Sequence, residues 1–144
     1  MPSVAAAKQW RCADCGRSFG RANQSHQCDP ALSLEQYLAK QPAERRSTYE
    51  AVLRVLRKLG PVDIDPVGVG IMVKRARTFC ELRPRRNAVE LSFKLSEPLA
   101  HPRIRRVVRS SVHRLAYFVD LASAADVDAQ IRSWLAESYR DSRE

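Results

Sequence analysis

The sequence has no long apolar run. No stretch of about 18 apolar residues occurs, so we expect no membrane-spanning helix. The first eight residues, MPSVAAAK, lack a basic segment followed by an apolar one, so we expect no secretory signal. Both absences favour a cytoplasmic protein, in which thiols stay reduced. The 144 residues, 44% hydrophobic and 28% charged, suit one domain with room for a small attached module.

Motifs typical of catalysis are also missing. Gly68 and Gly70 do not extend into a glycine-rich phosphate loop, and neither G-x-S-x-G nor H-E-x-x-H occurs. Cys80 lies in a predicted strand, where a buried thiol is more usual than a nucleophile. His101 and His113 have no carboxylate or serine partner that the sequence assigns. We therefore expect a non-enzymatic protein and assign no catalytic residue.

A compact group of metal-ligating side chains lies near the start of the chain. Three of the four cysteines and one of the three histidines fall within seventeen positions. Cys12 and Cys15 form a C-x2-C pair followed by a glycine, which permits the positive φ of a zinc-knuckle turn. His26 and Cys28 supply a second pair, and four such ligands complete a tetrahedron around Zn²⁺. We predict a structural zinc site in a module spanning residues 8–29.

Other interpretations of these thiols are weaker. A disulfide framework needs an oxidising compartment and leaves one of the three cysteines over, and a redox C-x2-C belongs with a thioredoxin-like βαβ unit that is not predicted here. Catalytic zinc is disfavoured because four protein ligands leave no position for water. Zinc would supply the folding energy that about 20–30 residues cannot gain by burial, with Trp10 and Phe19 as an apolar lid.

The module begins like a DNA-reading zinc finger but ends differently. The motif C-x2-C-G-x-x-F matches the first half of such a finger. Only residues 20–25 precede the histidine ligand, which is too few for the full helix that reads bases in the major groove. Base-specific reading is therefore not expected. Arg11, Arg17 and Arg21 are available for phosphate contacts or are ordinary solvated charges.

Residues 31–144 are predicted to form an α+β domain. Ser33 caps its first helix, Pro42 opens its second, and Gly60-Pro61 ends that helix. The predicted elements are helices at 34–40, 42–59 and 124–140 and strands at 77–83, 89–95 and 112–120. A hairpin turn is predicted at 84–87, after which apolar and polar residues alternate. Hairpin-length links favour a mostly antiparallel sheet packed against helices on one face.

Several motifs carry a resemblance to a known family. They are Trp10-Arg-Cys-x2-Cys-Gly-Arg-Ser-Phe, Asn23-Gln-Ser-His-x-Cys, Tyr49 with Gly60-Pro61-Val62, and Asp126-Val127-Asp128 through Trp134-Leu135 to Tyr139. In these motifs the chain resembles the bacterial family known as domain of unknown function 5655, in its form with an N-terminal CCHC zinc motif. The resemblance spans nearly the whole chain. It implies an α+β sheet-and-helix domain, no established activity and no catalytic residues.

The net charge of +9 is concentrated in the middle of the chain. Residues 74–109 carry eleven basic side chains against three acidic ones, and nine of the eleven are arginines, which suit bidentate phosphate contacts. The candidate phosphate-contacting residues are Arg75, Arg77, Arg83, Arg85, Arg86, Arg103, Arg105, Arg106 and Arg109. They form one cationic face if the hairpin tip and the 101–109 loop converge; the alternative is an ordinary solvated surface. Glu81 and Glu90, on facing strands, are expected to form salt bridges.

These observations favour a zinc-stabilised protein that binds DNA or RNA through phosphate contacts with little sequence specificity. Aromatic residues are scarce in the basic stretch, so stacking on single-stranded bases is not expected. One alternative is a protein-interaction adaptor that docks through its zinc module. Another is an enzyme or small-ligand carrier with an apolar cavity between the sheet and the last helix, near His113.

Overall fold

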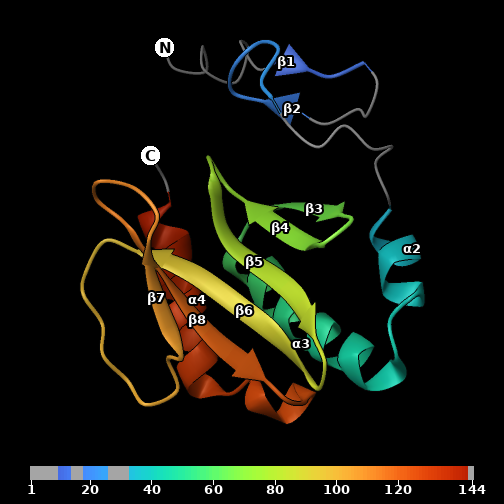
Figure 1. Ribbon diagram of the computed structural model, residues 1–144, viewed down its shortest axis with the longest axis vertical. Helices are drawn as coiled ribbons and strands as arrows, with labels where there is room; N and C mark the ends of the chain where they lie inside the picture. Colours follow the sequence, from blue (N-terminus) through green and yellow to red (C-terminus); the bar gives the residue numbers. More distant parts are fainter. Residues whose placement is uncertain (1–9, 14–17, 26–32, 143–144) are drawn as a thin grey trace.

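The computed structural model describes residues 10–13, 18–25 and 33–142. A six-stranded antiparallel sheet forms the centre of the α+β domain, in the spatial order β3-β4-β5-β6-β8-β7. Its strands are β3 (Asp63–Val67), β4 (Gly70–Lys74), β5 (Thr78–Arg85), β6 (Ala88–Leu95), β7 (Arg106–Arg109) and β8 (Leu115–Leu121). Figure 1 shows both long helices on the same face of this sheet. The predicted fold class, a mostly antiparallel sheet with helices on one face, is therefore confirmed.

The helices begin where the sequence places caps. In α2 (Leu34–Ala39) the Ser33 hydroxyl accepts the N–H of Gln36, whose side chain accepts the N–H of Ser33 in return. α3 (Ala43–Leu59) follows Pro42 and ends at Gly60. A 3-10 turn (Ala124–Asp126) leads into α4 (Ala129–Asp141), which Asp128 caps. These caps fix the starting points of α2 and α4.

The core lies between the sheet and the helices α3 and α4. Val89, Leu91, Phe93 and Leu95 alternate along β6, and each is at most 4% exposed. The ring of Phe93 stacks on Trp134 of α4 with 5.3 Å between centroids. The apolar residues of β6 therefore share one face, as predicted, and this face packs against the helices. The residues between them lie on the other face of the sheet, where charged side chains are found.

The sequence patterns missed three strands, β3, β4 and β7. β4 was not predicted because Pro66, Gly68 and Gly70 mark breaks, yet β3 and β4 form a hairpin with Pro66 opposite Ile71. Proline is tolerated in β3 because this strand is an edge of the described sheet. Gly70 has φ of +159°, and a Cβ atom there would collide with the main-chain oxygen of Leu82. β7 was taken for a loop because all four of its residues are exposed and show no alternation.

Three element boundaries also differ from the predictions. β8 begins at Leu115 and not at residue 112, because the N–H groups of Ser110 and Ser111 donate to the Arg114 carbonyl and close the turn before it. β5 continues through Pro84 to Arg85, so the hairpin turn contains only Arg86 and Asn87 rather than residues 84–87. The last helix begins at Ala129 and not at residue 124. Residues 124–126 form a separate 3-10 turn, and the extended backbone of Asp128 separates this turn from the helix that Asp128 caps.

The described part of the N-terminal segment contains a short hairpin. β1 (Trp10–Arg11) pairs with β2 (Ser18–Phe19), which places Trp10 opposite Phe19. Their ring centroids lie 5.9 Å apart, so the two residues predicted as an apolar lid do contact each other. Lys74 Nζ lies 5.4 Å from the centroid of Phe19 and connects this hairpin to the end of β4.

Candidate anion-binding site

The open face of the sheet gathers arginines around one carboxylate. Glu90, in the middle of β6, has a side chain only 7% exposed. Its Oε2 lies 3.6 Å from Arg85 Nη1 and 4.0 Å from Arg106 Nη2, and Arg105 donates a hydrogen bond to the same oxygen. Arg105 Nε also lies 3.0 Å from Asp120 Oδ2 on β8. The hairpin tip and the segment before β7 thus converge, but around an acid that offsets their charge.

Two further predicted arginines are also paired with acids. Arg83 Nη2 lies 3.3 Å from Glu81 Oε1 within β5. Arg103 donates to both carboxylate oxygens of Asp128 at 3.0 Å and to the main-chain oxygen of Asp126 at 2.9 Å. The expected salt bridges of Glu81 and Glu90 are therefore present. Arg103 therefore binds residues at the start of α4 and does not belong to the arginines of the open face.

Three other predicted arginines lie apart from the open face or bind the main chain. Arg75 lies over the Tyr139 ring, 4.0 Å from its centroid, and donates to the Tyr139 carbonyl at 2.9 Å. Arg109 donates to the carbonyls of Ser111 and Val112. Arg86 lines a hollow beside α3, at the turn between β5 and β6. The nine arginines therefore do not share one face.

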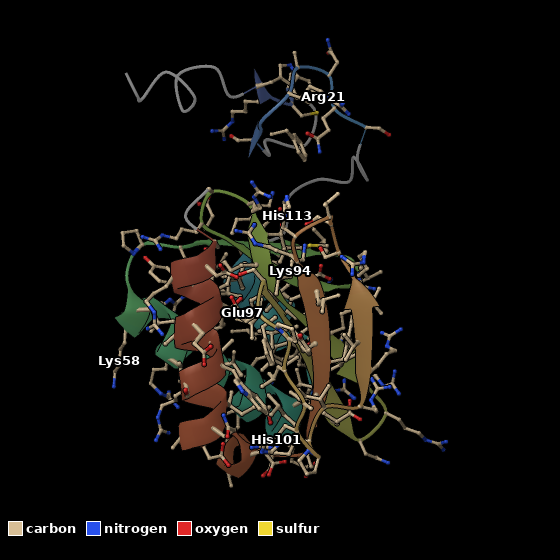
Figure 2. The ribbon with its side chains drawn as sticks, turned by 90° about the vertical axis from the view of Figure 1, so that its left-hand side faces the viewer. Arg21, Lys58, Lys94, Glu97, His101 and His113 are labelled. Atoms are coloured by element: carbon tan, nitrogen blue, oxygen red, sulfur yellow. The ribbon has the colours of Figure 1, made fainter. Side chains whose placement is uncertain are left out.

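The ninth arginine, Arg77, lines a polar cavity of about 460 Å³ at one end of the sheet. The cavity also has His113 and Arg114 from the segment between β7 and β8, and Arg140 from the end of α4. Ser96, Ser111 and Asp141 complete its lining. Figure 2 shows His113 at the end of the domain that faces the N-terminal segment carrying Arg21. Three chain segments thus bring basic side chains together.

The charge of this cavity is mostly uncompensated. Asp141 is the one acidic residue that lines it, and its carboxylate accepts the Ser96 N–H at 2.7 Å and the Ser96 hydroxyl at 3.0 Å. Arg114 donates to the main-chain oxygen of Asp141. Within the described residues neither Arg77 nor Arg140 forms an ion pair. Guanidinium groups with unused donors are the groups that bind phosphate in a bidentate manner.

Sequence reasoning identified Arg77 but missed Arg114 and Arg140. No spacing rule relates these three positions, because they meet only after the β4–β5 turn, the segment before β8 and the end of α4 have been folded together. A cavity does lie near His113 and the last helix, as the carrier hypothesis requires. Its lining is basic and hydroxylic, so it suits an anion better than the apolar ligand that hypothesis assumed.

Most of the predicted zinc site falls outside the described residues. Cys15, His26 and Cys28 are not described, whereas Cys12 is buried at 5% exposure beside the β1–β2 hairpin. In the part of the chain that the structure covers, no group of three or more His, Cys, Asp or Glu side chains is placed to hold a metal ion. Cys80 is buried in the core, and burial raises the pKa of its thiol, which opposes a nucleophilic role.

Comparison with known families identifies the larger domain. The model of the family described as domain of unknown function (DUF5655) matches residues 34–142. The chain belongs to this family. The match covers both faces of the sheet and the polar cavity lined by Arg77, and it begins after the predicted zinc module. Neither a curated protein nor a solved structure matches the sequence. No helix among the described residues is long and apolar enough to cross a membrane.

Proposed function

We propose that this protein is a non-enzymatic nucleic-acid-binding member of the DUF5655 family, which contacts phosphates with little sequence specificity. In this proposal it is the zinc-containing form of the family and acts in the cytoplasm of a bacterium. Cys12, Cys15, His26 and Cys28 would hold the structural zinc ion. The observation that carries the proposal is the cavity lined by Arg77, Arg114 and Arg140, whose charge exceeds that of its single acidic neighbour.

The geometry supports backbone contact over base reading. No Phe, Tyr or Trp side chain lines the cavity, and the imidazole of His113 is the one aromatic ring there, so the cavity offers little surface on which successive bases could stack. The arginines of the open face are held by Glu81, Glu90 and Asp120, which leaves them fewer donors for phosphate than the cavity has. We therefore assign the main phosphate contacts to the cavity and a secondary role to the open face.

The position of the N-terminal module supports a shared binding surface. Lys74, which contacts Phe19 of the module, immediately precedes the turn that carries Arg77. Arg21 of the module and His113 of the cavity lie toward the same end of the molecule (Figure 2). A nucleic-acid backbone that enters the cavity would therefore pass close to the basic residues of the module.

Fluorescence anisotropy with duplex and single-stranded oligonucleotides over a salt series tests this proposal. Affinity should fall steeply with salt, and the double variant Arg77→Ala/Arg140→Ala should flatten the dependence of log K on log salt by about 1 for each lost phosphate contact. The control variant Lys40→Ala/Arg57→Ala also removes two positive charges, but from positions outside the cavity. It should leave the dependence of log K on log salt nearly unchanged. Absence of binding at low salt, or equal effects of both double variants, would contradict the proposal.

A further inference from the structure

A second surface feature lies between α3 and α4, on the side away from the sheet. It is a groove of about 670 Å³ whose floor contains the small side chains of Ala51, Ala129 and Ala136. Val55 and Leu59 of α3 form one apolar wall, and Val127 adds to the other side. The groove residues of α3 and α4 recur at three- and four-residue spacings, so the groove follows both helices.

These apolar side chains are not required to fill the core. α3 faces the sheet with Val52, Leu53 and Leu56, which are at most 2% exposed, and α4 does so with Ile131 and Leu135, which are fully buried. Val55 and Leu59 are only partly buried and pack at the margin of that core. α3 and α4 therefore present a second, unfilled apolar surface to solvent. No described element covers it.

The rim of the groove is entirely cationic. Arg54 and Lys58 project from α3 and Arg132 from α4, and no acidic residue lines the groove. None of the three forms an ion pair with a described residue, and Arg132 makes only a long hydrogen bond of 3.5 Å to the Val127 carbonyl. Figure 2 shows Lys58 projecting outward from the molecule. An apolar floor between cationic rims is complementary to an apolar stripe between acidic ones.

We propose that this groove binds an acidic amphipathic helix of a partner protein. A small-residue floor between two helices lets a third helix approach to the roughly 8–10 Å of ordinary helix packing. The 13 residues of α4 extend over about 20 Å, which matches a ligand helix of three to four turns. A second copy is a poorer occupant, because the chain carries a net charge of +9 and two cationic rims would face each other.

The test uses two synthetic fluorescent peptides of about four helical turns and the full-length protein. Both carry Leu and Ala at i, i+3, i+4 and i+7; one has Glu at the flanking positions and the other has Lys at the same positions. The acidic peptide should bind and the basic one should not. Failure of the acidic peptide to bind at low salt would overturn the proposal, as would equal binding of both peptides.

Variants locate the binding site. Arg54→Glu/Lys58→Glu should weaken binding of the acidic peptide by at least about tenfold, because like charges then face each other. Arg57→Glu reverses a charge on an exposed position of the same helix that does not line the groove, and should change affinity much less. Ala136→Trp fills the floor of the groove without changing its charge, and it should abolish binding of the acidic peptide. Unchanged affinity in both groove variants would overturn the proposal.

Sedimentation velocity and vesicle binding check the competing occupants. The protein should remain a monomer in the absence of peptide, and vesicles of anionic phospholipid should not compete with the acidic peptide. A dimer that the Lys58→Glu substitution dissociates would overturn the proposal in favour of self-association. Displacement of the peptide by those vesicles would overturn it in favour of a lipid surface. Nucleic-acid binding through the cavity is unaffected by either result, because Arg77 and Arg140 do not line the groove.

Discussion

At the scale of single residues, Glu90 organises the open face of the sheet. Among the described residues it is the one charged residue that is buried, with 6% of the surface of the whole residue exposed. The side chains of Arg85, Arg105 and Arg106 cover it while remaining 36–51% exposed themselves. A buried carboxylate is tolerated here because several guanidinium groups replace the water it loses. Three of the eleven basic residues between positions 74 and 109 therefore hold a buried carboxylate in the fold.

Replacing Glu90 by Gln should destabilise the protein by about 1–3 kcal/mol, because the three guanidinium groups lose a charged acceptor. The loss stays moderate since the arginines can turn back to solvent. Urea unfolding followed by circular dichroism measures it. Glu81→Gln is the matched control: its partner Arg83 is 47% exposed, so a loss of about 0–1 kcal/mol is expected. Equal unfolding midpoints for the two variants would show that Glu90 has no special role.

At the scale of elements, a helix or strand could be predicted from the sequence where its own residues carry a local signal for it. Ser33 and Pro42 mark helix starts by local chemistry, and the alternation from Val89 to Leu95 marks a strand with one buried face. β7 has no such signal, because it exists only through pairing with β8 and exposes all four residues. β3 and β4 were obscured by proline and glycine that suit an edge hairpin but resemble a loop.

Asp128 links the start of α4 to the pH dependence of stability. A hydrogen bond from the Ile131 N–H, and then the Arg103 guanidinium, lower the pKa of its carboxyl below the ordinary value. The folded chain therefore takes up this proton less readily than the unfolded chain. The stability contributed by Asp128 is fully present above its ordinary pKa of about 4 and is lost as the pH falls through the lower folded value.

Asp128→Asn should consequently be less stable than the parent protein at pH 7, and this difference should shrink as the pH falls below about 4. Urea unfolding at a series of pH values measures the difference. Glu137→Gln changes an exposed residue of the same helix whose side chain has no hydrogen bond or ion pair to the described residues, and it should show no such convergence. A stability difference for Asp128→Asn that persists undiminished at acid pH would contradict this interpretation.

At the scale of the whole molecule, the fold class was predictable and the candidate site only in part. Periodicity and turn chemistry identify an α+β domain because they are local properties. The cavity depends on three arginines that no local pattern relates. Arg77 was identified from charge density, whereas Arg114 and Arg140 fall in a segment whose overall balance is acidic. Conversely, Arg103 and Arg105 looked available in the sequence but are held by Asp128, Glu90 and Asp120.

The two tryptophans report separately on the two parts of the molecule. Trp10 belongs to the N-terminal hairpin and contacts Phe19, while Trp134 is 3% exposed and packs on Phe93 and His101. If zinc is the folding centre of the module alone, a chelator should red-shift only the Trp10 emission. The domain has its own core of buried residues, so Trp134 should keep its emission.

The variant Trp10→Phe isolates the Trp134 signal, and subtracting its spectrum from that of the parent protein gives the Trp10 signal. Chelation should leave the spectrum and the urea midpoint of Trp10→Phe unchanged, while intact-mass measurement of the parent shows loss of one zinc ion. Cys15→Ser should reproduce the chelated spectrum without any chelator, because three ligands hold the ion less tightly than four. A Trp134 shift on chelation would mean that the metal stabilises the whole molecule, and the absence of bound zinc in the purified protein would refute the proposed site.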